Sequence, residues 1–458
     1  MIEFYYKYFE KNYISKVTQL HSDLERLFNI YEIKVPKNDD NYFENKFKRN
    51  LNNDIWIDLN NFYTYIKKED SLPSIFKKFI KEGKRQTGPT MIDTFAGAGG
   101  MSLGFENAGF YARHINEIDP RLLETYYFNR DINLTNYHCG DISEFNNYLS
   151  EKGVNKQKID VLIGGPPCQG FSNANRQRII DDPRNILYKN FVELVAELRP
   201  NFFIMENVRG MMNKSEEIIS DFEENLGTEY KITSMLLNAK DYGIPQNRVR
   251  FFFICSSSKL FNGDDFKNKI ITKSKENSFV LKDALKNLPE LFPKKEKNKK
   301  IENKKIGYKF SMHASTSEYS KYINKSEVNI LSNHTNRFNN SRDIEIFRKL
   351  PEGENSLHES IKDIMPYKSR NDIFKDKYYK LKNNDVSKTI TAHMSLDCNM
   401  YIHPNQPRGL SPREAARLQT FPDNYIFMGA NKSWYKQIGN AVPVKLAEII
   451  GNEIMELI

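Results

Sequence analysis

A single cysteine, Cys168, sits among residues whose types suit covalent chemistry. The run 164–172 reads GGPPCQGFS and follows the apolar stretch 159–163, which predicts a strand. Open α/β sheets bind ligands beyond the carboxyl ends of their strands, and a thiolate is a strong nucleophile. We therefore expect Cys168 to attack a substrate, although a lone loop cysteine is more often a small buried residue.

Two further segments could bring an acid and two cations to the same edge of a sheet. Glu206 follows the apolar stretch 202–205, and Arg248 and Arg250 lie at the start of a predicted strand at 249–255. A carboxyl at a strand end can hold or donate a proton. Two arginines spaced two apart are expected on the same side of the chain, where they could bind an anionic or carbonyl-bearing substrate.

A glycine-rich loop indicates a cofactor site. Residues 93–100 read DTFAGAGG between a predicted strand and a predicted helix, so a ligand can approach the backbone and the free amides of the helix. The spacing fits neither a dinucleotide loop nor a phosphate-binding Walker loop. Glu117, at the end of the next predicted strand, is placed to bind ribose hydroxyls, and Asp141 could meet an adenine edge. S-adenosylmethionine fits this pattern best, although acids at strand ends often only cap helices.

The order of strand and helix patterns predicts the fold class. From residue 89 to about residue 257, strands, loops and helices alternate, which is typical of an α/β fold with a parallel sheet and helices on both faces. Residues 1–85 carry helical patterns without chemistry. A basic, irregular region then runs to about residue 399, and a helical pattern at 442–458 closes the chain.

The amino-acid composition narrows the class of protein further. The chain has 458 residues, a net charge of +9 and four widely spaced cysteines, so neither a disulfide framework nor a zinc site is expected. No signal peptide or membrane span is evident, and we expect a cytoplasmic protein. The segment 259–309 holds fifteen lysines against seven acidic residues. This excess predicts a polyanionic partner, although its densest part, 294–305, equally fits a solvated surface insertion.

Eight motifs in a fixed order resemble the DNA (cytosine-5)-methyltransferase family. One such match would be weak, but eight in order make coincidence negligible. They are 93–104, NEID at 116–119, GDI at 140–142, PPCQ at 166–169, ENV at 206–208, Q-x-R-x-R at 246–250, REAARLQTFP at 413–422 and QIGNAVP at 437–443.

The resemblance implies a domain organisation and a set of partners. It implies a Rossmann-like S-adenosylmethionine-dependent methyltransferase domain at 86–260, completed by 430–458, with a mixed, mostly parallel sheet. A smaller target-recognition domain would occupy 261–429, and residues 1–85 would form a helical extension. The family implies a bacterial restriction–modification enzyme, which we expect to be a monomer that binds double-stranded DNA in the nucleoid. A cognate endonuclease could be encoded nearby without a required complex.

The resemblance also implies residue roles. Cys168 would add to carbon 6 of a flipped cytosine, Glu206 would bind its exocyclic amine and ring nitrogen 3, and Arg248 would hold its carbonyl oxygen, with Arg250 in the same catalytic set. Carbon 5 would receive the methyl group, leaving S-adenosyl-L-homocysteine, and no metal is expected.

The cofactor contacts would be Phe95, Gly97, Gly99, Gly100, Glu117, Ile118, Asp141, Ile142, Pro166, Asn440 and Val442. Candidate DNA-facing residues are His334, Arg337, His393, Arg408 and Arg413.

Three classes of function stay open at this stage: a DNA methyltransferase, a transfer-RNA cytosine methyltransferase on the same fold, and a catalytically silent DNA-binding or regulatory protein. Gly170 after Gln169 and the long variable region favour DNA over transfer RNA. The presence of Cys168, Glu206 and Arg248 argues against a silent protein. An amino-methylating enzyme is disfavoured, since its Asn/Asp-Pro-Pro-Tyr/Phe motif is absent.

Overall fold

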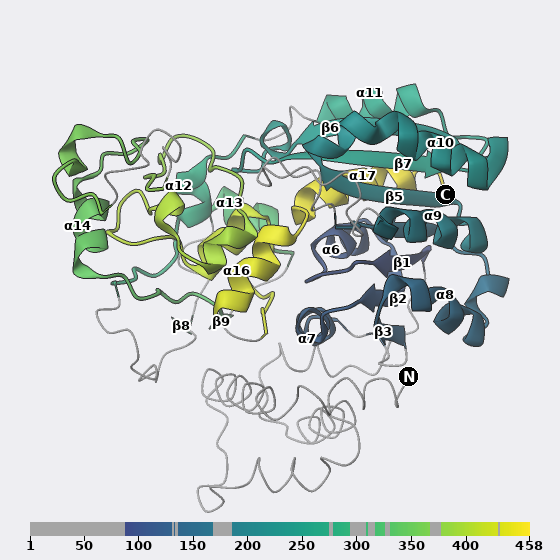
Figure 1. The fold of residues 1–458 in the computed structure, drawn as a ribbon, viewed down its shortest axis with the longest axis horizontal. Helices are drawn as coiled ribbons and strands as arrows, with labels where there is room; N and C mark the ends of the chain where they lie inside the picture. The colour runs from purple at the N-terminus through teal and green to yellow at the C-terminus, as the bar shows by residue number, and fades with distance from the viewer. Residues whose placement is uncertain are drawn as a thin grey trace, which may run out of the picture.

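The computed structural model shows two lobes, a broad sheet flanked by helices and a smaller lobe of short helices and loops (Figure 1). The predicted helices within residues 1–85, Cys168 itself and the lysine-rich tract 294–305 lie outside the described residues. These are 88–130, 132, 136–167, 186–273, 278–293, 308–309, 317–325, 330–366, 377–428 and 431–458.

A seven-stranded sheet forms the larger lobe, in the order β3-β2-β1-β4-β5-β7-β6. The first five strands pair in parallel, whereas β7 runs antiparallel to both β5 and β6. The sheet is therefore mixed and mostly parallel, as predicted. The strands are β1 (Thr90–Thr94), β2 (Tyr111–Glu117), β3 (Tyr137–Cys139), β4 (Val161–Gly164), β5 (Phe202–Val208), β6 (Lys231–Asn238) and β7 (Val249–Ser256).

Helices cover both faces of this sheet, because the side chains of each inner strand point alternately to the two faces. In β4, Ile163 packs into one hydrophobic cluster and Leu162 into the other. The first cluster lies under α6 (Gly100–Asn107), α7 (Pro120–Phe128), α11 (Gly263–Lys273) and α17 (Val444–Met455). The second lies under α8 (Ile142–Glu151), α9 (Ile186–Leu198) and α10 (Ser215–Leu226).

The chain returns to the sheet at its carboxyl end through close packing of α17 on α6. A Cβ on Gly104 would lie 2.5 Å from both the Val444 carbonyl oxygen and the Ala447 Cβ. Only glycine allows the two helix backbones to approach this closely. The last helix therefore completes the helical layer on this face of the sheet, in agreement with the predicted closing helix.

A third hydrophobic cluster fills the smaller lobe with residues such as Leu281, Tyr319 and Tyr435, and it reaches the sheet lobe at Ala98 and Val444. Within the described residues, no helix of either lobe is both long enough and apolar enough to cross a bilayer. The elements of the smaller lobe are α12 (Leu281–Leu285), α13 (Glu318–Ile323), α14 (Ser341–Lys349), α15 (Pro412–Leu418), α16 (Asn431–Asn440) and a small sheet of β8 (Tyr308–Lys309) with β9 (Ile330–Leu331).

Two elements lie on the other side of the predicted domain boundaries. Helix α11, which was expected in the inserted domain, buries Phe266 and Ile270 in the core of the large sheet. Helix α16, which was expected to complete the catalytic domain, instead buries Trp434 and Ile438 in the smaller lobe. Packing therefore assigns residues up to about 273 and from about 444 to the sheet lobe.

Candidate active site

The register of the sheet brings three chain segments together at one edge. Thr94 at the end of β1 pairs with Gly164 at the end of β4, and Gly164 pairs with Met205 in β5. The glycine loop, the turn that leads to Cys168, and Glu206 near the end of β5 therefore lie side by side. The strand order reverses between β1 and β4, which is where ligands bind in open α/β sheets.

The turn after β4 packs directly against the end of β5. A Cβ on Gly165 would lie 3.2 Å from Glu206 Oε2, so the absence of a side chain lets the turn and the carboxylate approach. Asn207 fixes the contact, since its Nδ2 donates to the Pro166 carbonyl at 2.9 Å. The chain segment that precedes Cys168 is thus tied to Glu206 and Asn207, while Cys168 itself lies outside the described residues.

Glu206 forms an ion pair with Arg250. Their Oε1 and Nε atoms are 2.8 Å apart, and the two side chains are only 12% and 14% exposed, respectively. In the antiparallel pairing of β5 with β7, Arg250 lies opposite Val208, so Arg250 and Glu206 are diagonal neighbours on one face of the sheet. Burial raises the pKa of Glu206 above its ordinary value, although the charges of Arg250 and Arg248 oppose the shift. This carboxyl group therefore holds a proton more readily than an exposed glutamate.

Arg248 has different partners from those expected of a substrate-binding arginine. Its side chain is fully buried. Nη1 donates to the Ile390 carbonyl at 2.7 Å, and Nη2 donates to the carbonyls of Gly439 and Ala441 at 3.0 and 2.8 Å. The prediction that Arg248 holds the substrate's carbonyl oxygen is therefore not supported. Arg250, two residues along, provides the guanidinium beside Glu206.

Gln246 contributes to the same connection between lobes, a role that the sequence did not reveal. It is fully buried. Its Nε2 donates to the Leu418 carbonyl at 2.8 Å, and its Oε1 accepts from the Ile390 amide at 2.8 Å. The first two polar residues of the Q-x-R-x-R motif thus join the lobes, and the third faces the site.

The glycine loop has an unusual backbone that leaves one face open. Phe95, Gly97 and Gly99 all have left-handed φ angles, of 53°, 56° and 77°. A Cβ on Gly97 would meet no described atom closer than 4.0 Å, while the Gly97 amide donates to Glu117 Oε2 at 2.8 Å. The loop backbone at Gly97 is therefore accessible to a ligand.

The residues around Glu117 lie beside the glycine loop and form another side of the candidate cofactor site. Its other oxygen accepts from the Asp119 amide at 2.9 Å, and burial raises its pKa. Ile118, next in the chain, is 57% exposed, so its apolar side chain is available to pack on a flat ring. Asp141 caps α8 by accepting from the Ser143 amide, and Ile142 begins that helix, so their predicted cofactor contacts stay predictions.

Packing explains the two other glycines of the loop. A Cβ on Gly99 would lie 2.7 Å from the terminal nitrogens of Arg130, and one on Gly100 would lie 2.6 Å from the Val442 carbonyl oxygen. The predicted site residue Val442 is therefore brought to the glycine loop from the far end of the chain. Asn440, two residues earlier, has an exposed side chain.

Most of the predicted DNA-facing residues are structural. Arg408 and Arg413 are fully buried, and the prediction that they face DNA was wrong. Arg408 forms an ion pair with Glu414 at 2.6 Å, and Arg413 donates to the carbonyls of Ser332, Pro422 and Tyr425.

The predicted DNA-facing histidine of this region also has a structural role. His334 is buried and bonds to Ser411 Oγ and the Pro289 carbonyl. Arg337 donates to the carbonyls of Met394 and Leu396. Of the five predicted residues, His393 keeps an exposed side chain.

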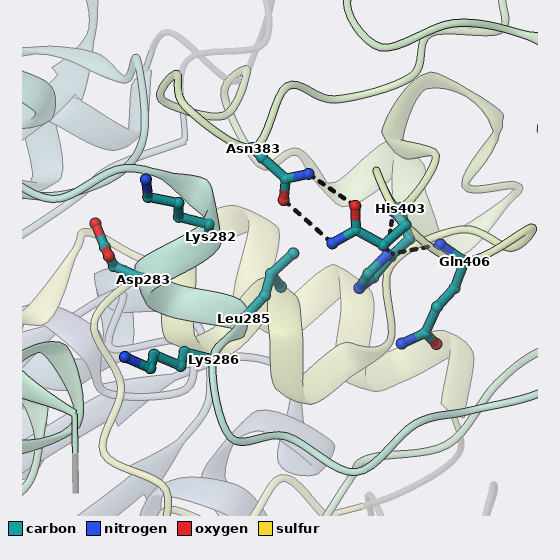
Figure 2. A pocket seen from close by; sticks show the side chains of 8 residues that line it. Lys282, Asp283, Leu285, Lys286, Asn383, His403 and Gln406 are labelled. Atoms are coloured by element: carbon teal, nitrogen blue, oxygen red, sulfur yellow. Dashed lines mark hydrogen bonds between the residues drawn. The ribbon is translucent and has the colours of Figure 1, made fainter. Parts of the chain in front are cut away.

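A pocket of about 380 Å³ opens in the smaller lobe, away from the strand ends. Figure 2 shows it between helix α12 and the loop around His403. Burial lowers the pKa of His403 to about 4, so this side chain is neutral at pH 7, and its Nδ1 accepts from the Asn405 and Gln406 amides. The lining carries charges of both signs, since Asp283 lies beside Lys282 and Lys286. The pocket is lined by Lys282, Asp283, Leu285, Lys286, Asn383, His403, Asn405 and Gln406.

Comparison with known proteins gives a consistent result. The profile of the C-5 cytosine-specific DNA methylase family matches residues 89–456. Type II methyltransferase M1.HphI of Haemophilus parahaemolyticus is 32% identical over 80% of this chain and 87% of its own length. Type II methyltransferase M.DdeI of Desulfomicrobium norvegicum is 32% identical over 80% and 88%. A prophage-encoded protein of E. coli, described as a DNA modification methyltransferase, has a crystal structure that matches with a TM-score of 0.63, 29% identity, and coverage of 81% and 99%.

Arg248 and Arg250 are expected to respond differently to substitution. Arg248→Lys leaves several buried carbonyls without a donor, and we expect it to lower the free energy of unfolding by about 3 kcal/mol. Arg250→Lys retains a cation beside Glu206 and removes one donor, from the Val249 carbonyl, so it should cost only about 1 kcal/mol. Urea denaturation of both variants measures the difference, and an equal or reversed ranking would contradict the assignment.

Asp93 should make stability depend on pH. It is buried beneath the glycine loop, and burial raises its pKa from 3.8 to about 7. Because the folded state binds this proton more tightly than the unfolded state, the stabilisation is complete below about pH 4 and is lost as the pH rises to about 7. Relative to Asp93→Asn, the parent chain should lose up to about 1.4 kcal/mol per pH unit across that range. Urea denaturation at pH 5, 6 and 7.5 checks this, and a constant difference between the two proteins would refute it.

Proposed function

Because this chain belongs to the family of C-5 cytosine-specific DNA methylases, we propose that it methylates carbon 5 of a cytosine within a specific double-stranded DNA sequence. The methyl donor is S-adenosylmethionine, and the second product is S-adenosylhomocysteine. One observation carries the proposal: the open glycine loop, the turn before Cys168, and the Glu206–Arg250 pair lie at adjacent strand ends.

The residues at this edge fit the donor. The open backbone at Gly97 can take the methionine and ribose part without a clash. Glu117 can accept hydrogen bonds from ribose hydroxyls, and the exposed Ile118 can pack on the adenine. Val442 would close the far side. When bound, the donor supplies an electrophilic methyl group on its sulfonium.

The chain's own residues would activate the base. Carbon 5 of cytosine is a weak nucleophile, and addition of the Cys168 thiolate to carbon 6 makes it enamine-like. The base must leave the duplex to reach the thiol. Glu206, whose pKa burial raises, would hold a proton at ring nitrogen 3 and accept from the exocyclic amine. After carbon 5 has taken the methyl group, a base removes the carbon 5 proton, the 5,6 double bond re-forms and Cys168 leaves as the thiolate.

Arg250, rather than Arg248, is the candidate for the cytosine carbonyl oxygen. Its Nε is committed to Glu206 at 2.8 Å, and one terminal nitrogen donates to the Val249 carbonyl. The guanidinium carries five N–H donors, so further donors can serve the oxygen as negative charge builds on the base.

The relatives named as type II methyltransferases support a restriction–modification role. In that role the enzyme protects host DNA from a cognate endonuclease, acts as a monomer in the bacterial cytoplasm and needs no stable complex with that endonuclease. A transfer-RNA substrate and a silent regulatory role are less well supported, because the family profile is that of a DNA methylase.

Covalent catalysis can be tested on a trapped intermediate. With duplex DNA that carries 5-fluorocytosine and with S-adenosylmethionine, the parent chain should form an adduct that survives denaturing electrophoresis, because fluorine blocks the final elimination. Cys168→Ser should form none and should lose methyl transfer, while its affinity for S-adenosylhomocysteine stays within about threefold.

Cys398→Ser is the matched control for this experiment. Cys398 is a free cysteine that is buried in the smaller lobe beside Arg337. This variant should still form the adduct. Methyl transfer by Cys168→Ser would rule out the covalent mechanism.

A further inference from the structure

A buried guanidinium forms the floor of the glycine loop. The Arg130 side chain is only 4% exposed. Its Nη2 donates to the Gly99 carbonyl at 2.8 Å and to Ser102 Oγ at 3.2 Å, and its Nε donates to Glu106 at 2.9 Å. Gly99 has no side chain, so Arg130 packs directly beneath the loop backbone.

A tyrosine from a distant part of the chain completes this floor. The Tyr425 hydroxyl donates to the Ala98 carbonyl and accepts from Arg130 Nη1 at 2.9 Å. Tyr425 lies between α15 and α16, 295 positions from Arg130. Two bonded side chains therefore hold the carbonyls of two consecutive loop residues.

A carboxylate and an aromatic ring stabilise the buried positive charge of Arg130. Glu106 forms an ion pair with it, and the Tyr126 ring centroid lies 3.8 Å from its guanidinium carbon, which is a favourable cation–π distance. Lysine would retain the charge but could not reach Gly99, Glu106 and Tyr425 from one nitrogen, because only guanidinium spreads its donors over a fork.

We propose that Arg130 and Tyr425 are positioning residues for the cofactor. By holding the Ala98 and Gly99 carbonyls inside the protein, they keep the loop in its left-handed backbone and leave Gly97 facing the methyl donor. The left-handed Phe95 in particular is a conformation that costs about 1–3 kcal/mol and persists only where the surroundings enforce it. This inference rests on the S-adenosylmethionine site proposed above.

Calorimetric titration with S-adenosylhomocysteine tests the proposal. Tyr425→Phe removes one hydroxyl and leaves the Ala98 carbonyl without its donor, and we expect the Kd to rise about tenfold. Arg130→Lys should raise it at least as much. In steady-state assays the KM for S-adenosylmethionine should rise in parallel, whereas kcat at saturating donor and the KM for DNA should stay within about twofold.

Tyr435→Phe is the matched control. Tyr435 is also a buried tyrosine whose hydroxyl donates to a main-chain carbonyl, that of Leu410 at 2.7 Å, but this bond lies within the smaller lobe. This variant should lose a similar amount of thermal stability with a Kd within about twofold of the parent value.

The outcomes separate this inference from the proposed function. If Tyr425→Phe lowers the Tm as Tyr435→Phe does and keeps the parental Kd, the floor is only structural and the inference is overturned. If the folded parent chain does not bind S-adenosylhomocysteine at all, the cofactor assignment fails, and this inference fails with it. If Arg130→Lys does not fold, Tyr425→Phe alone decides.

Discussion

The alignment of the carboxyl ends of β1, β4 and β5 is the constraint on which the site depends. Thr94, Gly164 and Met205 lie in one row across the sheet, and Thr94 Oγ1 donates to the Ile163 carbonyl at 3.0 Å. A one-residue slip would turn the side chains of a strand to the other face of the sheet. Register therefore brings the glycine loop, the turn before Cys168, and Glu206 to one edge.

Buried hydrogen bonds keep the smaller lobe in a fixed position relative to this edge of the sheet. Gln246 and Arg248 precede β7 and bond to main-chain groups of Ile390 and of the carboxyl end of α16. An unpaired buried guanidinium would be costly, so these bonds favour one arrangement of the lobes. The same short motif thus places Arg250 beside Glu206 and joins the two lobes through its other two members.

The sequence predicted the parallel strands and the glycine loop well, because inner strands buried on both faces read as continuous apolar runs. The edge strand β6 was missed, since its alternating exposure gives a weaker signal. Arg408 and Arg413 were misjudged because charged side chains are usually exposed, and their buried acceptors lie on other segments. Arg130 and Tyr425 could not be found from local patterns, as their contact joins distant parts of the chain.

The central claim is that this chain methylates carbon 5 of cytosine in DNA through Cys168. Sequencing that maps 5-methylcytosine, on DNA from a host without cytosine methylation, tests it most directly when cells express either the parent chain or Cys168→Ala. The account predicts 5-methylcytosine at one recurring sequence context with the parent chain and none with the variant. No methylated context with a folded parent chain, or the same methylation with Cys168→Ala, would contradict it.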